Sequence, residues 1–203
     1  PALAGLMLAQ TSATVLFGLN TISFVAVLAA VASTAPAPPP AGPRAPASQQ
    51  IAEAFGFVFK HPGPRALFAM LLLLSALAAP LQRMLPLFVA DVFRAGEASY
   101  GLLLGLFGAG AVVGGLTLGR WPSWYPRHHL IPLALTLTGA FMTLFCATHE
   151  LALGGVWIAA AGVVWIWAFS STMTALQLLV GDTMRGRVLA VVNMAMFGAM
   201  PIG

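Results

Sequence analysis

Charged residues are scarce in this 203-residue chain, since Asp, Glu, Lys and Arg together make up 7% of it. Soluble domains carry roughly 25% charged residues, whereas 60% of this chain is hydrophobic and its mean hydropathy is +0.93. A soluble globular domain is therefore excluded, and the composition indicates an integral membrane protein. The formal charge is only +4 and the cations lie between apolar runs, so topology explains the basic character and no nucleic-acid partner is expected.

Lysine and cysteine each occur once, at Lys60 and Cys146. A phosphate-binding P-loop needs a glycine before its lysine, and Lys60 follows Phe59, so that ATPase motif is absent from the sequence. Cys146 has no partner for an internal disulfide, and because it stands in an apolar run it is expected to fill the core. No acid stands in the middle of an apolar run, so we expect no proton-carrying carboxylate in this sequence.

Motifs for catalysis are also missing. His149 and Glu150 begin like a zinc-protease signature, but Leu153 stands where the second histidine is needed. No G-x-S-x-G occurs, and the adjacent His128 and His129 would diverge by about 100° on a helix, which makes a poor metal site. The sequence predicts no enzyme, no cofactor and no metal.

Long apolar segments make up most of the chain, and most of them approach the roughly 20 residues with which a helix crosses a bilayer. After a first piece at residues 1–8, they cover residues 13–32, 66–87, 100–118, 130–148, 151–179 and 188 onward. The predicted fold class is all-α, a polytopic membrane helix bundle. Because the sequence begins without Met and within apolar residues, we interpret it as an internal piece of a longer protein.

A proline-rich segment, residues 33–64, interrupts the apolar runs and cannot lie inside a bilayer. Its Pro/Ala tract at 35–47 excludes a regular helix, because proline lacks an N–H and restricts the residue before it. From residue 48 four apolar residues recur at helical spacing until Pro62, namely Ile51, Phe55, Val58 and Phe59. They predict a short amphipathic helix that lies on the membrane surface or packs against the protein's own loops.

The cations are divided unequally when the predicted spans alternate across the bilayer. Seven of the nine fall on the side of the 33–64 segment: Arg44, Lys60, Arg65, Arg120, Arg127, Arg185 and Arg187. Cytoplasmic loops carry the excess of Lys and Arg. The segment is therefore predicted to be cytoplasmic, in a multi-pass protein whose first partner is the lipid bilayer.

Glycines recur along the predicted 100–118 span, at Gly101, Gly105, Gly108, Gly115 and Gly119, with Gly110 and Gly114 beside them. Bare glycine lets two helix backbones approach closely in lipid, where hydrophobicity does not drive helices together. The row predicts a close helix contact, either static or moving.

A polar and aromatic stripe follows one face of the 151–179 span: Trp167, Ser170, Ser171, Thr174 and Gln177. In lipid such a stripe must face protein or water. It predicts a bundle interior or an aqueous cavity, with ordinary interhelical hydrogen bonding as the alternative. Gln82 and Arg83 stand near the outer end of the 66–87 span, where Arg83 either contacts substrate or snorkels to the surface.

Two motifs near the end of the chain resemble those of a known family. Residues 181–188 read Gly-Asp-Thr-Met-Arg-Gly-Arg-Val, and residues 197–203 read Phe-Gly-Ala-Met-Pro-Ile-Gly. They resemble the P-D-x-x-R-G-R-V loop and F-G-x-x-P-x-G helix of major facilitator superfamily exporters, in the enterobactin-exporter-like or transmembrane secretion effector branch. Residues 1–5 and 19–24 resemble motifs of that family's fifth and sixth helices. Gly181 replaces the family's proline, and the loop 119–127 lacks its acid and much of its basic cluster.

The resemblance implies two six-helix halves that rock about a midplane site, with this chain running from helix five into helix eleven. Residues 1–32 would end the first half, 33–64 would link the halves and 65–203 would belong to the second. The implied function is ion-driven export of a small amphipathic molecule, siderophore or drug-like, across the inner membrane. The coupling ion, a proton, would act through the half outside this sequence.

The resemblance also assigns roles to residues. The substrate would contact Asn193 together with Gln82, Arg83 and the stripe. Asp182, Arg185 and Arg187 would form ion pairs that close the inner face, unless Asp182 is only a helix N-cap. A membrane scaffold or receptor that kept the fold without transporting is the alternative.

Overall fold

The computed structural model of the protein describes residues 13–34, 46–120 and 127–199, without the side chains of 13, 16, 78–82, 127–128 and 199. These parts contain helices and no strand: α2 (Ala13–Ala32), α3 (Ala47–Lys60), α4 (Pro62–Asp91), α5 (Glu97–Gly119), α6 (Arg127–Ala147), α7 (Leu151–Leu179) and α8 (Asp182–Ala199). The predicted all-α fold is confirmed. The predicted piece at residues 1–8 and most of the Pro/Ala tract lie outside the described residues.

Three of the described helices are long and apolar enough to cross a membrane: Glu97–Gly119, His129–Ala147 and Leu151–Leu179. The number rises to four if α3 and the first part of α4, which meet at a bend of 100°, count as one broken span. The described part of α8, at 18 residues, does not meet the same requirement, although a span was predicted there. The chain is a multi-pass membrane bundle.

One proline separates α3 from α4. Proline cannot continue a helix but is well tolerated in its first turn, where its missing N–H is not needed. Pro62 therefore ends α3 as predicted and also begins α4, which then runs for 30 residues instead of the predicted 22 at 66–87. At 1.5 Å per residue α4 is about 45 Å long, more than the roughly 30 Å hydrocarbon core. Its length therefore exceeds what a crossing of the hydrocarbon core requires.

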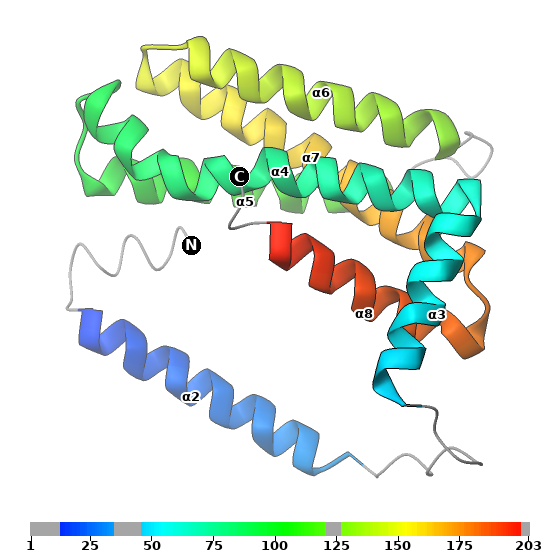
Figure 1. The fold of residues 1–203 in the computed structure, drawn as a ribbon. Coiled ribbons are helices and arrows are strands. Elements are labelled where there is room, and N and C mark those ends of the chain that lie inside the picture. Colours follow the sequence, from blue (N-terminus) through cyan, green and yellow to red (C-terminus); the bar gives the residue numbers. More distant parts are fainter. Residues whose placement is uncertain (1–12, 35–45, 121–126, 200–203) are drawn as a thin grey trace.

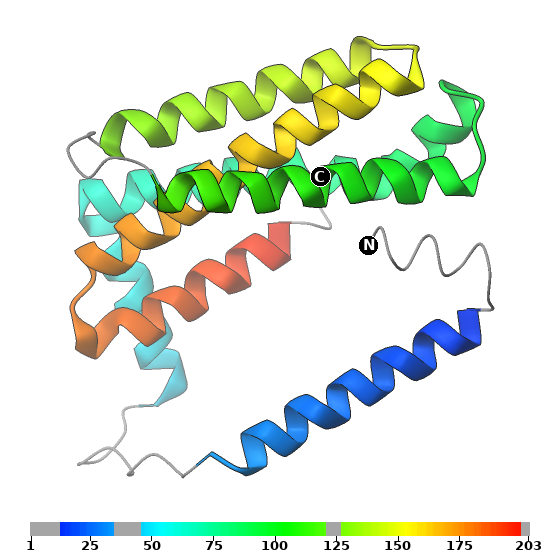
Figure 2. The same ribbon diagram turned by 180° about the vertical axis from the view of Figure 1, so that it is seen from behind.

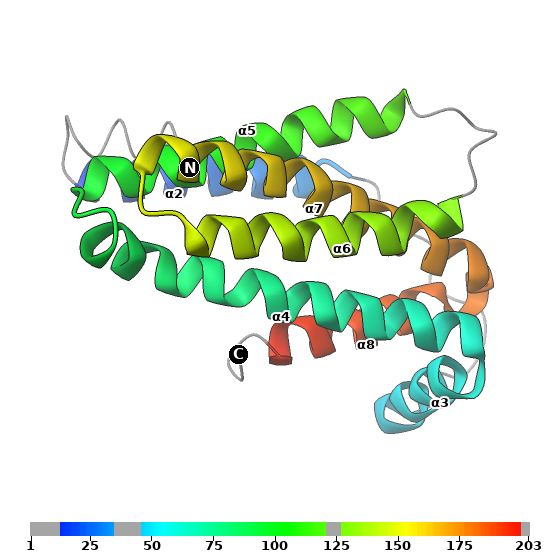
Figure 3. The same cartoon turned by 90° about the horizontal axis from the view of Figure 1, so that it is seen from above.

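The long helix α7 lies at the centre of the bundle (Figures 1 and 3). It packs along α5 and α6, and part of its length also contacts α4. On the other side of α4 lies α8, and α3 crosses the end of the α4–α8 pair. The view from behind in Figure 2 shows α2 apart from the other helices, and its described side chains are exposed.

Glycines let α5 and α7 approach to backbone contact. A Cβ added at Gly110 would stand 2.0 Å from the Ala159 carbonyl oxygen, and one at Gly162 would stand 2.1 Å from that of Phe107. Gly114 is equally crowded by Val163. Because no side chain fits at these points, the two backbones meet directly, as close helix packing in lipid requires.

The glycines at this contact differ from those predicted. A Cβ at Gly108, Gly115 or Gly119 would meet nothing within 4 Å in the described chain, so these three do not bring α5 onto α7. Gly101 is buried and Gly105 is half-buried. The predicted contact face followed glycines about four residues apart. The observed contact face of α5 instead runs through Gly110 and Gly114, the two glycines that the prediction placed next to that face.

The amphipathic helix α3 packs on two other helices. Ala54 and Val58 are fully buried in an apolar cluster with Leu71 of α4 and with Val188 and Val192 of α8. Its support therefore comes from helices, not from the loops that the sequence suggested as one alternative. Contact with a membrane surface stays a prediction for the exposed apolar residues of α3, Ile51 and Phe59.

Candidate transport site

The stripe on α7 does not face one environment. The indole N–H of Trp167 donates hydrogen bonds to the carbonyl oxygen of Gly114, at 2.9 Å, and to the hydroxyl of Thr117, at 3.0 Å. Both acceptors lie on α5. This part of the stripe therefore matches the predicted alternative, a hydrogen bond between helices.

The middle of the stripe contains a buried hydroxyl group without a hydrogen-bond partner in the described chain. Ser171 is only 4% exposed, and its Oγ has no hydrogen-bond partner in the described chain. Ser170 and Thr174, on either side, are half-buried. A buried polar atom without a partner costs about 1 to 3 kcal/mol, and in membrane proteins such groups mark functional positions.

A second buried, unpaired polar group lies on α7 at a residue that the sequence pattern did not indicate. The Nε1 of Trp165 is buried and unpaired in the described chain. Its indole stacks on Phe169 with a centroid distance of 5.3 Å, and it also contacts Phe107 of α5 at 5.8 Å. Trp165 lies two residues from Trp167 and therefore off the stripe, which is why helical spacing did not select it.

The remaining predicted contacts come from separate places. Gln177 lies exposed near the end of α7, Asn193 lies exposed on α8, and Arg83 lies exposed on α4. The side chain of Gln82 lies outside the described residues. The described helices thus do not bring these residues into one enclosed pocket.

Two of the three predicted gating residues act locally. Arg185 forms an ion pair of 2.8 Å with Asp182, one turn before it on α8, and its Nε donates a hydrogen bond of 3.3 Å to the Gln177 carbonyl oxygen. That carbonyl belongs to the last turn of α7, where a cation is favourable because the helix dipole ends there. Arg185 therefore joins the end of α7 to the start of α8.

The third predicted gating residue, Arg187, reaches a distant helix. Its guanidinium forms an ion pair of 3.0 Å with Glu53 of α3. Glu53 was not among the predicted site residues, and no local pattern could have selected it, since the two are 134 positions apart. The pair connects the segment before α4 with the first turns of α8.

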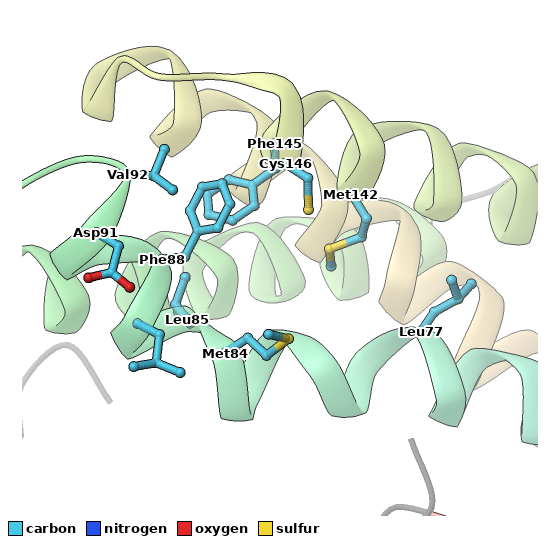
Figure 4. A pocket seen from close by; sticks show the side chains of 10 residues that line it. Leu77, Met84, Leu85, Phe88, Asp91, Val92, Met142, Phe145 and Cys146 are labelled. Atoms are coloured by element: carbon cyan, nitrogen blue, oxygen red, sulfur yellow. The ribbon is translucent and has the colours of Figure 1, made fainter.

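A separate groove of about 450 Å³ lies between α4 and α6 (Figure 4). Its lining is apolar apart from Asp91, and it includes Met84, Phe88, Met142 and Cys146. Cys146 is exposed there, so the expectation that it fills the core was wrong, because its side of α6 faces outward. The groove contains none of the predicted substrate contacts, so we do not place the substrate in it.

Comparison with known proteins gives one family. The family model described as transmembrane secretion effector matches residues 1–203. The chain belongs to this family of major facilitator transporters. No curated protein and no solved structure matches it. Membership in the secretion effector family makes transport, rather than enzymatic catalysis, the expected activity of the whole protein, and it confirms the resemblance found in the sequence.

Among the described residues, no group of three or more His, Cys, Asp or Glu is arranged to hold a metal ion.

Proposed function

We propose that the protein is a secondary transporter that exports a small amphipathic molecule, siderophore or drug-like, by alternating access driven by an ion gradient. The observation that carries this proposal is the family match over the whole sequence. The described helices add a compatible architecture, because α4, α5, α7 and α8 pack as one body that can rock as a unit. The coupling ion, a proton, acts through residues outside this sequence.

The proposed substrate contacts are the polar groups that the bundle leaves unused. They are Ser170, Ser171 and Thr174 of α7, Gln177 at its end, Asn193 of α8 and Arg83 of α4. We add Gln82 of α4, whose side chain lies outside the described residues. Exposed amides such as Asn193 are costly against lipid and are expected to face protein or an aqueous cavity. Trp167 contributes to this site by holding α7 on α5, with its N–H already used.

The proposed orientation places residues 33–64 in the cytoplasm and the protein in the inner membrane. The side that holds this segment also holds most of the cations, in agreement with the positive-inside rule. On this side Asp182, Arg185 and Arg187 would help to close the inner face. The 3.0 Å pair between Arg187 and Glu53 is the part of that closure supported by a contact between helices distant in sequence.

A transport assay tests this proposal. The full protein would be placed in inverted membrane vesicles, and uptake of ethidium and of a fluorescent siderophore analogue would be measured with and without a proton gradient. Because export from a cell corresponds to uptake by an inverted vesicle, we expect gradient-dependent uptake that a protonophore abolishes. Uptake into right-side-out vesicles instead would overturn the direction, and no transport in either would favour the scaffold.

The scaffold or receptor is the second candidate. It is favoured by one observation, that Trp167, Arg185 and Arg187 all make contacts within the bundle. In a scaffold, however, the buried and unpaired hydroxyl of Ser171 would only reduce stability, whereas in a transporter it can bind substrate. Ser171 therefore favours the transporter.

A further inference from the structure

The bend between α3 and α4 determines how α3 is oriented relative to a membrane. The two helices meet at 100°. If α4 crosses the bilayer, α3 must run nearly parallel to the bilayer plane. Because α4 is longer than the hydrocarbon core, its first turns lie at headgroup depth. The elbow made by Lys60, His61 and Pro62 therefore lies at the level of lipid phosphates.

Within the described parts of the chain, the cations at this elbow have no acidic partner. Among the acids of the chain, Asp91, Glu97 and Glu150 stand at the opposite end of the bundle, at the end of α4 and the starts of α5 and α7. The other two, Glu53 and Asp182, are paired with Arg187 and Arg185. Lys60 and Arg65 are exposed and take part in no ion pair within the described parts of the chain.

Apolar side chains stand exposed beside these cations. Phe59, next to Lys60, is 51% exposed although its ring contacts Phe55 and Phe68, and Ile51 is 41% exposed two turns earlier. Ala54 and Val58 hold α3 on the protein, and the exposed Ile51 and Phe59 lie beside this packed face. An in-plane helix with apolar anchors and adjacent cations is the arrangement that binds anionic membrane surfaces.

We propose that the elbow between α3 and α4 is a binding site for anionic phospholipid headgroups. Lys60 and Arg65 bind the headgroup phosphate, while Phe59 and Ile51 insert at the boundary with the acyl chains. The occupant is a lipid of the surrounding leaflet, because the exposed apolar residues would gain nothing from a free phosphate ion in water. The site does not depend on the transported substrate.

Gly56 offers a position for a probe. It is exposed, a Cβ there would meet nothing within 4 Å, and it lies one turn before Phe59 and Lys60. We suggest the full protein with Cys146→Ser, any other cysteines replaced, and Gly56→Cys labelled with the fluorophore NBD. It would be reconstituted into phosphatidylcholine bilayers containing increasing amounts of brominated phosphatidylglycerol, or of brominated phosphatidylcholine as the reference. Bromine quenches the probe only at contact distance.

We expect the anionic brominated lipid to quench at a lower mole fraction than the zwitterionic one. A cation near the surface adds an attraction corresponding to about fivefold in local lipid concentration, so Lys60→Gln with Arg65→Gln should raise the half-quenching fraction by about that factor for each residue. The control is Arg94→Gln with Arg120→Gln, which removes the same charge from exposed residues outside the elbow. Equal quenching by the two lipids, no quenching by either, or an unchanged curve in the elbow variant would overturn the proposal.

Discussion

The indole N–H of Trp167 on α7 donates a 2.9 Å hydrogen bond to the carbonyl oxygen of Gly114 on α5. Gly114 is also a point at which the α7 backbone comes too close for any side chain. Gly114 thus allows the two backbones to approach closely and also provides the carbonyl oxygen that accepts the hydrogen bond. The hydrogen bond and the glycine contact therefore stabilise the same part of the α5–α7 interface.

Replacing Trp167 with Phe should destabilise the protein modestly. The change keeps an aromatic ring but removes the donor, and hydrogen bonds between membrane helices contribute about 0.5 to 1.5 kcal/mol. The unfolding free energy in detergent or bicelles is the measurement. Thr117→Val, which removes the second acceptor, should add little to Trp167→Phe because both act on the same bond. Full additivity of the two changes would contradict the contact.

Replacing Gly110 or Gly162 with Ala should strongly destabilise the protein. Each new methyl group would meet a carbonyl oxygen of the facing helix at close to 2 Å, so the helices must separate, at about 2 kcal/mol or more. Folded yield and melting temperature report the loss. Gly108→Ala and Gly115→Ala are the matched controls, because their added methyl groups enter open space. If the control pair were as damaging as the contact pair, the α5–α7 contact would be misassigned.

Ser171→Ala should stabilise the protein while it reduces transport. The hydroxyl is buried without a partner in the described chain, and removing such a group recovers up to about 1 to 3 kcal/mol. If the hydroxyl binds substrate, the initial transport rate falls at the same time. A loss of stability would indicate that Ser171 has a partner elsewhere in the full protein, and unchanged transport would remove it from the site.

The Glu53–Arg187 pair should matter for the docking of α3 more than for total stability. Both side chains are more than a third exposed, at 42% and 38%, so solvent limits the pair to about 0 to 1 kcal/mol. In an Ala54→Cys, Cys146→Ser background, Arg187→Glu should increase maleimide labelling of the buried position 54. The reversed pair, Glu53→Arg with Arg187→Glu, should restore protection. Without that restoration, the ion pair would not be holding α3.

Much of the fold followed from the sequence because apolar runs and their polar ends are local features. The 151–179 run lies between Glu150 and Gly181, and α7 has the predicted bounds. Pro62 ends α3 as the sequence predicts. Pro62 also begins α4, and that helix is longer than the prediction at both ends. The helical periodicity of α3 predicted its apolar face, and Val58 of that face is buried.

The site was less predictable because it depends on which helices become neighbours. The spacing of Trp167 placed it on a polar face, but nothing in the sequence indicated that Gly114 and Thr117 would accept hydrogen bonds from its N–H. The glycine contact was expected on α5, yet a difference of one or two residues rotates a position around the helix by about 100° or more. The link from Arg187 to Glu53 depends on a docking between distant segments, which local patterns do not encode.

Transport by an Asn193→Ala variant tests the central claim most directly, that the polar groups left unused by this bundle contact an exported molecule. Gradient-driven dye uptake into inverted vesicles would be compared with that of Thr143→Ala, whose exposed hydroxyl bonds only the Gly139 carbonyl of its own helix. Loss of one substrate hydrogen bond should lower the initial rate by about tenfold for Asn193→Ala and leave Thr143→Ala unchanged. Equal rates in the two variants, at equal folded amounts, would contradict the account.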